Sequence, residues 1–223
     1  METEQITLAA LKETDGIVVA TGNKGKVKEI KAILGPLLPG RNFYALSEIA
    51  LDEYVEPEEN GDTFAQNAFI KAKTAQERLG VTAIADDSGL CVDALDGAPG
   101  IFSARWAGAH GDDHANNVKL LDELAKRGAN TPEERKAHFV SSVALVFADG
   151  TMLTGEGTCK GSIATQEAGS NGFGYDPIFL TDALGGETTT AQISAEEKNQ
   201  ISHRSKALRE LAVALQEFLT NKR

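Results

Sequence analysis

Cysteine is scarce in this 223-residue chain, which has only Cys91 and Cys159, far apart in the sequence. Two distant cysteines cannot build a disulfide framework or a cysteine-rich zinc site, so we expect two reduced, buried thiols. Basic residues are also few: 22 Lys and Arg stand against 33 Asp and Glu, a formal net charge of -11. This charge argues against binding of nucleic acid duplexes, which requires a basic surface, but it allows a small anion in a local basic pocket.

Long apolar runs are missing as well. No stretch is long enough to span a bilayer, and residues 1–16 are polar and acidic, without the basic start and apolar centre of a signal peptide. We therefore expect a cytoplasmic protein with no membrane partner, in which residues 1–16 form a short acidic N-terminal extension. The remainder has the composition of an ordinary globular protein, with enough length for one large or two small domains.

The most informative stretch is Ala85-Asp86-Asp87-Ser88-Gly89. It follows a strand-like run, Val81 to Ala85, and we expect the strand to end there in a Ser-Gly turn, with residues 90–92 as a continuing or returning strand. Successive strand residues point to opposite faces, and an unpaired buried carboxylate is costly, so Asp86 and Asp87 indicate a nearby cation. That cation is either a divalent metal or a Lys or Arg from elsewhere. The alternative is a simple polar turn, because these residue types favour turns.

A second motif, Thr21-Gly22-Asn23-Lys24-Gly25-Lys26, lies between a predicted strand, residues 17–20, and a predicted helix that ends at Gly35-Pro36. A loop with glycine and lysine at a helix N-terminus can cradle a phosphate with backbone N–H groups and positive charge. Its spacing is not that of a Walker A loop. The alternative is an ordinary strand-to-helix turn with surface lysines.

Three further elements follow from periodicity. A helix is expected from Asp62 or Thr63 to Leu79, with Gly80 as its terminator and with Asn67 and Lys71 on one face, where they serve a ligand or face water. Another begins at Asp112 or Asp113 and turns Val118, Leu121 and Leu124 inward. Residues 137–147 and 152–154 form a hairpin, so we expect a mixed rather than a purely parallel sheet.

The last part of the chain carries two more candidate ligand segments. The glycine-rich loop at 169–177 allows close approach of the backbone to a ligand, with aromatic side chains to stack on a flat ring; the alternative is a crossover with buried aromatics. Ser194 to Glu197 has the form of a capping box and starts a short helix with Lys198. His203 and Arg204 open the final helix, a placement that opposes the helix dipole unless the pair receives an anion.

A polyphosphate with a flat base, together with Mg²⁺, would account for all of these features. Magnesium prefers one or two carboxylates with waters and substrate phosphates, which suits Asp87 with Glu59.

The combined motifs resemble the inosine triphosphate pyrophosphatase family, also called XTP/dITP diphosphatases, and most closely its bacterial members. The resemblance covers the chain from about Gly16 to its end. It rests on segments in the family order: 21–26, 59–64 with Asn67 and Lys71, 85–90, 97–105, 172–179 and 202–204.

The resemblance implies an α/β fold in which an elongated mixed β-sheet is flanked by helices, in two lobes with a central cleft, as a single domain over residues 17–223. It also implies a homodimer that hydrolyses ITP, dITP and XTP to the monophosphate and pyrophosphate with Mg²⁺ as cofactor.

Carried over by position, the resemblance makes Asp87 the catalytic proton acceptor and, with Glu59, a metal ligand. The residues expected to bind the nucleoside triphosphate are Thr21, Gly22, Asn23, Lys24, Gly25, Lys26, Ser88, Phe173, Gly174, Tyr175, Asp176, Lys198, His203 and Arg204. Asp86 is left open as a second metal carboxylate or a group that tunes Asp87. The donors that select a six-oxo purine are His203 and Arg204, or backbone amides at 173–176.

Two rival functions use the same residues. A phosphatase or pyrophosphatase for standard nucleotides would need the same carboxylates and lysines, and a non-catalytic nucleotide sensor would not need Asp87. A structural or interaction protein would leave the anion-binding residues unexplained.

Overall fold

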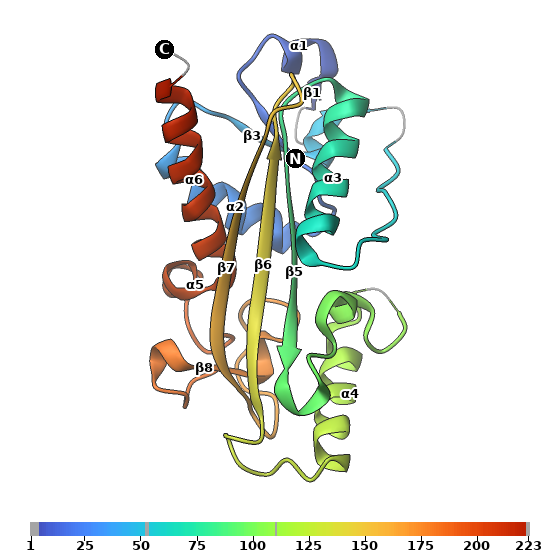
Figure 1. The fold of residues 1–223 in the computed structure, drawn as a ribbon, viewed down its shortest axis with the longest axis vertical. Helices are drawn as coiled ribbons and strands as arrows, with labels where there is room; N and C mark the ends of the chain where they lie inside the picture. The colour runs from blue at the N-terminus through green and yellow to red at the C-terminus, as the bar shows by residue number, and fades with distance from the viewer. Residues whose placement is uncertain (1–4, 52–53, 110, 222–223) are drawn as a thin grey trace. The chain divides into compact units, whose positions relative to one another are not determined.

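The computed structural model of the protein describes residues 5–51, 54–109 and 111–221. It contains helices and strands in alternation, followed by a long hairpin and a helical C-terminal part (Figure 1). The helices are α1 (Leu8–Lys12), α2 (Lys24–Leu37), α3 (Phe64–Leu79), α4 (Asp113–Lys126), α5 (Ala195–Ile201) and α6 (His203–Asn221). The strands are β1 (Ile6–Thr7), β2 (Ile17–Val19), β3 (Phe43–Ala45), β4 (Ile49–Ala50), β5 (Ala83–Val92), β6 (Lys136–Val146), β7 (Met152–Ile163) and β8 (Phe179–Thr181).

The main sheet is mixed, as predicted. Its six strands are ordered β3-β2-β5-β6-β7-β8. Strand β2 runs parallel to both β3 and β5, whereas β8 is antiparallel to β7. The predicted hairpin is confirmed, since β6 and β7 are neighbours joined by a turn in which the Phe147 amide donates to the Thr151 carbonyl at 2.8 Å.

The chain divides into two compact units. The first comprises residues 1–87, 142–156 and 206–223, and the second comprises residues 88–141 and 157–205. The chain passes from one unit to the other within β5, β6, β7 and α6. Each unit has its own hydrophobic core, and each is described separately below.

The N-terminal segment is not a tail from Gln5 onward, which corrects the expectation of a short extension. Strand β1 pairs in parallel with β4, with Ile6 opposite Ile49. Thr7 then caps α1, and Leu11 is completely buried in a core of the first unit. The apolar residues of an acidic segment are enough to anchor it, because one fully buried leucine contributes about 1.5–3 kcal/mol relative to an exposed one.

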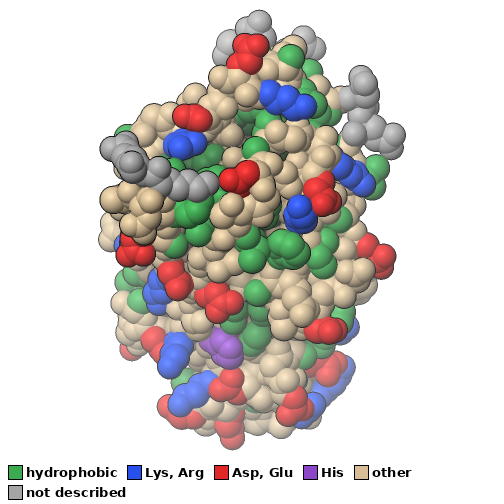
Figure 2. All heavy atoms as spheres, turned by 45° about the horizontal axis from the view of Figure 1, so that its top comes forward, with side chains coloured by type: hydrophobic (Ala, Val, Ile, Leu, Met, Phe, Trp, Pro, Cys, Tyr) green, Lys and Arg blue, Asp and Glu red, His purple; other side chains and the backbone are tan. Residues whose placement is uncertain are grey.

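Acidic and basic side chains are interspersed on the face shown in Figure 2, with hydrophobic atoms between them. This mixture is typical of a protein surface, much of which is apolar. None of the helices in the described ranges combines the length and hydropathy needed to cross a bilayer.

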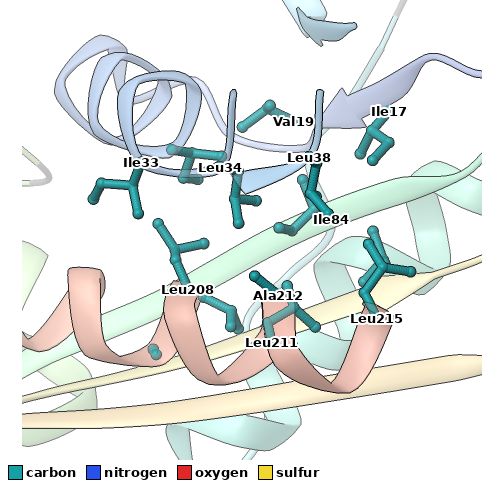
Figure 3. Packing of buried hydrophobic residues seen from close by; sticks show 14 residues of the cluster. Ile17, Val19, Ile33, Leu34, Leu38, Ile84, Leu208, Leu211, Ala212 and Leu215 are labelled. Carbon is teal, nitrogen blue, oxygen red and sulfur yellow. The ribbon is translucent and has the colours of Figure 1, made fainter. Parts of the chain in front are cut away.

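The core of the first unit follows the twofold alternation of its strands. Ile17, Val19 and Ile84 pack with α2 and α6 on one face of the sheet, in a cluster where leucines of α6 lie opposite Ile33 and Leu34 of α2 (Figure 3). The residues between them in the strands point to the other face and pack with α1 and α3; these are Val18, Ala20, Ala83, Ala85, Ala144 and Val146. This alternation fixes the direction of every later side chain in β5.

Helix α2 continues past the predicted stop at Gly35-Pro36 and ends at Leu37. A residue before proline normally avoids helical geometry because its Cβ meets the proline ring. Gly35 has no Cβ, so this clash with the ring of Pro36 does not arise. The Gly-Pro pair is therefore tolerated in the last turn.

The second unit has a core in which α4 packs with β5, β6, β7 and the segment that leads into β8. Leu120 and Leu124 of α4 are completely buried there, and Leu121 packs against the cluster from a half-buried position. The prediction that Val118 faces inward was wrong, since 42% of its surface is exposed. The helix itself begins as predicted, with Asp112 as its N-cap.

Candidate active site

The two adjacent carboxylates lie inside a strand and not at its end. β5 continues through Asp86, Asp87, Ser88 and Gly89 to Val92, so the predicted Ser-Gly turn is wrong, whereas the prediction that residues 90–92 continue the strand is confirmed. Asp86 is completely buried and Asp87 is 6% exposed. Their burial requires partners, and the strand alternation determines from which helices these come.

Asp86 points to the face covered by α2. Its carboxylate forms an ion pair with Lys26 at 2.8 Å, and the Lys26 ammonium also reaches the Asp86 carbonyl at 3.4 Å. Asp86 is therefore not exposed in a turn but forms a buried ion pair with a residue of the predicted phosphate loop. The two alternatives for its role, a second metal carboxylate or a group that tunes Asp87, stay predictions.

Asp87 points to the face covered by α3, where Lys71 lies. The Lys71 ammonium donates to Asp87 Oδ1 at 2.9 Å and to Glu59 Oε1 at 2.7 Å. Glu59 and Asp87 are thus close together, as expected for a shared site, with a lysine between them. Lys71 is a missed residue of this group: the sequence indicates it through the helix face that it shares with Asn67 and through the family motif, but neither signal assigns it a role as a ligand.

The pKa values of this group are shifted by burial and by charge. Burial raises the pKa of Asp87 against the opposing effects of Lys71 and Lys26, and Glu59 raises it further. Burial opposes the charged form of Lys71, but Asp87 and Glu59 together raise the pKa of that ammonium. The cluster therefore keeps Lys71 charged, and Asp87 is a stronger base than an ordinary aspartate.

The donor set fits a divalent cation that brings other ligands with it. The described residues contain no group of three or more His, Cys, Asp or Glu side chains that could hold a metal alone. Oδ2 of Asp87 is nevertheless buried and accepts no hydrogen bond from any described residue. Two carboxylates with one open, buried oxygen suit Mg²⁺, which usually keeps waters and substrate phosphates in its shell.

The predicted phosphate loop leads into α2 as expected. Asn23 is the N-cap, and its Oδ1 accepts from the amides of Gly25 and Lys26 at 2.9 and 3.1 Å. The hydroxyl of Thr21 accepts from the Asn23 amide at 3.2 Å. These internal hydrogen bonds hold the loop in shape, while the Lys24 side chain is exposed at the first position of the helix.

In the second unit the loop at 169–177 is built around the Asp176 carboxylate. Asp176 is 2% exposed, and Oδ2 accepts from the Phe173 amide at 2.8 Å and from the Lys198 ammonium at 2.5 Å. Oδ1 accepts from the Thr190 hydroxyl at 2.7 Å. Both oxygens of Asp176 are therefore engaged in hydrogen bonds inside the protein, and its direct contact with substrate stays a prediction.

Tyr175 is also directed into the protein. It is 4% exposed, packs in the core of the second unit and donates to the Ser103 carbonyl at 2.9 Å. Burial raises the pKa of its hydroxyl, so the group stays protonated. For Tyr175 the alternative of a buried aromatic is confirmed.

Phe173 is half-buried and lies beside two cations. Its ring centroid is 4.6 Å from the Lys198 ammonium and 5.5 Å from the Arg204 guanidinium. Arg204 also donates to the Ser88 hydroxyl at 2.8 Å, and His203 stacks on Phe139 at 4.6 Å between centroids. The structure thus brings Ser88, Phe173, Lys198 and Arg204 together within the second unit.

The chain resembles known proteins over most of its length. Residues 17–214 match the model of the Ham1 family. The dITP/XTP pyrophosphatase of Streptomyces coelicolor is 48% identical over 204 residues, which cover 91% of this chain and 98% of that protein. The Haemophilus influenzae protein of the same name is 46% identical over 194 residues, covering 86% of this chain and 94% of that protein.

Solved structures agree with these sequence relatives. The Staphylococcus aureus Ham1 protein has a TM-score of 0.75 and 42% identity, and the match covers 93% of this chain and all of that one. A HAM1 protein from Coxiella burnetii has a TM-score of 0.77 and 38% identity, with 91% and 98% of the two chains covered. From the family match over nearly the whole chain and from these relatives, the chain belongs to the Ham1 family.

Proposed function

We propose that the protein hydrolyses purine nucleoside triphosphates with a deaminated base, namely dITP, ITP and XTP, to the monophosphate and pyrophosphate. The observation that carries this proposal is the buried Asp87, whose pKa is raised and whose Oδ2 is open while Oδ1 is held by Lys71. The relatives named dITP/XTP pyrophosphatase supply the substrate class. Removal of such nucleotides would keep deaminated purines out of DNA and RNA.

The reaction needs an activated water and a stabilised leaving group. Water attacks the α-phosphorus, the new oxygen–phosphorus bond forms as the bond to the β-phosphate oxygen breaks, and pyrophosphate leaves. Asp87 accepts the proton of the water, a role that its raised pKa suits because the best general base titrates near the working pH. Lys71 keeps Asp87 in one orientation through a 2.9 Å hydrogen bond.

Magnesium dependence is part of the proposal. Glu59 and Asp87 are the residues that would hold the ion. When bound, Mg²⁺ would neutralise charge on the phosphoryl oxygens, which is usually a large part of catalysis in phosphoryl transfer.

The remaining predicted ligand residues have separate assignments in the proposal. Lys24 and the start of α2 would bind the triphosphate through charge and the helix dipole. The ring of Phe173 would stack on the base, with Lys198, His203 and Arg204 as donors to its oxo groups. The Phe173 amide is already used by Asp176, so we assign selection of the six-oxo group to these side chains and not to that amide.

A homodimer and a cytoplasmic location belong to the proposal on the strength of family resemblance alone. A hydrolase for standard nucleotides would use the same carboxylates, and a nucleotide sensor would bind without turnover.

Pyrophosphate release tests the proposal. We would measure it with Mg²⁺ for dITP, ITP, XTP, ATP and GTP, for the native chain and for Asp87→Asn. The first three should be cleaved and the last two barely, and Asp87→Asn should lower kcat about a hundred- to ten-thousand-fold, the scale of a lost general base.

The same substitution at the exposed Asp122 controls for the loss of one carboxylate. Equal turnover of all five nucleotides would remove the assigned selectivity. Near-native turnover by Asp87→Asn would refute the role of Asp87, and nucleotide binding without any pyrophosphate would indicate a sensor.

A further inference from the structure

Two side chains from the first turns of α4 form hydrogen bonds with the backbone amide and carbonyl of Gly174, which follows Phe173 in the loop at 169–177. Asp113 Oδ2 accepts from the Gly174 amide at 2.7 Å, and Asn117 Nδ2 donates to the Gly174 carbonyl at 3.3 Å. Asn117 Nδ2 is also 2.9 Å from Glu167 Oε1, so the carboxylate fixes the amide group that reaches the loop. Asn117 is only 1% exposed, and its position is therefore determined by packing.

The loop needs such support because two of its residues are glycines in the left-handed region. Gly172 and Gly174 have φ values of 76° and 65°, in the left-handed region that costs other residues energy. A Cβ on Gly172 would collide with the Asp176 carboxylate, so the loop folds tightly over that group. Glycine loses more conformational freedom on ordering than any other residue, so a loop with two glycines keeps one conformation only when surrounding groups hold it in place.

Hydrogen bonds hold the backbone on both sides of the Phe173 side chain. On one side its own amide donates to Asp176, which is anchored by Lys198. On the other side the amide and carbonyl of the next residue are held by Asp113 and Asn117. The Phe173 ring is thus set beside Lys198 and Arg204 by contacts from outside the loop as well as within it.

We propose that Asp113 and Asn117 are positioning residues for nucleoside binding, acting through Gly174 on the Phe173 ring. The proposal rests on the proposed function, in which Phe173 stacks on the purine base. Neither residue touches the reacting phosphate, so their loss should weaken binding of the ground state and transition state alike. Such uniform weakening raises KM and leaves kcat nearly unchanged.

The neighbouring Asn116 provides a matched control. It is 2% exposed, and its Oδ1 accepts from the Ala107 amide at 2.7 Å, so it holds a different loop. Asn116→Ala and Asn117→Ala each remove one buried asparagine from the same turn of α4. A general loss of stability would affect both variants, whereas a positioning role belongs only to Asn117.

The experiment compares Asp113→Ala, Asp113→Asn, Asn117→Ala and Asn116→Ala. For dITP, Asp113→Ala and Asn117→Ala should raise KM about tenfold, the scale of one lost hydrogen bond, with kcat changed less than about twofold. Asp113→Asn keeps an oxygen acceptor for the Gly174 amide and should recover much of the loss. Asn116→Ala should leave KM close to the native value.

Hydrogen exchange of the amides at 172–176, in the protein without nucleotide, gives a second readout that does not depend on activity. Faster exchange in Asp113→Ala and Asn117→Ala, but not in Asn116→Ala, is the expected result. Native exchange and native KM in both variants would overturn the proposal, and so would equal changes in Asn116→Ala. If the native chain releases no pyrophosphate, the proposed function fails, and the exchange data still decide whether α4 holds the loop.

Discussion

Asp86 and Asp87 differ in role because they are neighbours in a strand. One residue faces α2 and meets Lys26, and the next faces α3 and meets Lys71. Each carboxylate has a cation. Lys71, the cation of Asp87, also pairs with a second carboxylate, Glu59, and Oδ2 of Asp87 accepts no hydrogen bond from the described residues. A one-residue shift of β5 would exchange these environments, so the strand register determines which aspartate meets Lys26 and which meets Lys71.

Lys71 should matter for stability as much as for turnover. Lys71→Met leaves Glu59 and Asp87 close together without their cation, and breaking a buried ion pair typically costs about 3–5 kcal/mol of unfolding free energy. We expect urea unfolding without metal to show this loss. Addition of Mg²⁺ should then stabilise Lys71→Met more than it stabilises the native chain, because the ion can replace the missing positive charge.

Lys73→Met is the control for that experiment. Lys73 lies on the same helix, but its pair with Glu77 is on the surface, where an ion pair contributes at most about 1 kcal/mol. An equal effect of Mg²⁺ on the two variants and the native chain would show that Glu59 and Asp87 do not bind the ion.

At the scale of elements, local signals were sufficient for most helices and for the hairpin. Gly80 ends α3 in a left-handed conformation, and Ser194 with Glu197 forms the capping box of α5, both as predicted. These features depend on residues a few positions apart, which a sequence displays directly.

The strand through Asp86 and Asp87 could not be predicted in the same way. Its residues are turn formers, and the groups that allow them to be buried lie far along the chain: Lys26 is 60 residues from Asp86 and Lys71 is 16 from Asp87. Long-range partners overrode local preference here. The family motif identifies Glu59 and Asp87 as candidate ligands. It does not show that Lys71 lies between them, because that contact depends on the folded chain.

The N-terminal helix gives a prediction at this scale. Leu11 is completely buried against the core that α3 covers, so Leu11→Ala should lower the unfolding free energy by about 2–5 kcal/mol. Leu8 is half-buried on the same helix, and Leu8→Ala should cost clearly less. Urea unfolding of both variants measures the difference, and an unchanged midpoint for Leu11→Ala would mean that the segment is dispensable.

For the molecule as a whole, the distribution of charge favours binding of a small anion over binding of a polymeric one. The net charge is -11, yet residues 24–31 of α2 carry four lysines and one glutamate, a local charge of +3. A free triphosphate is small enough to interact with this segment alone. A duplex presents many phosphates over a long surface and would also meet the acidic remainder, without the extended basic face that releases counterions.

Competition experiments follow from this distribution. An excess of a short DNA duplex at low salt should leave the KM for dITP unchanged, whereas inorganic triphosphate, which offers similar charge in a small volume, should compete and raise it. A rise in KM with duplex that disappears on adding salt would instead identify an electrostatic surface for nucleic acid. The duplex spreads its charge over a long surface and the triphosphate concentrates it in a small volume, so their comparison tests the local basic segment against the charge of the whole chain.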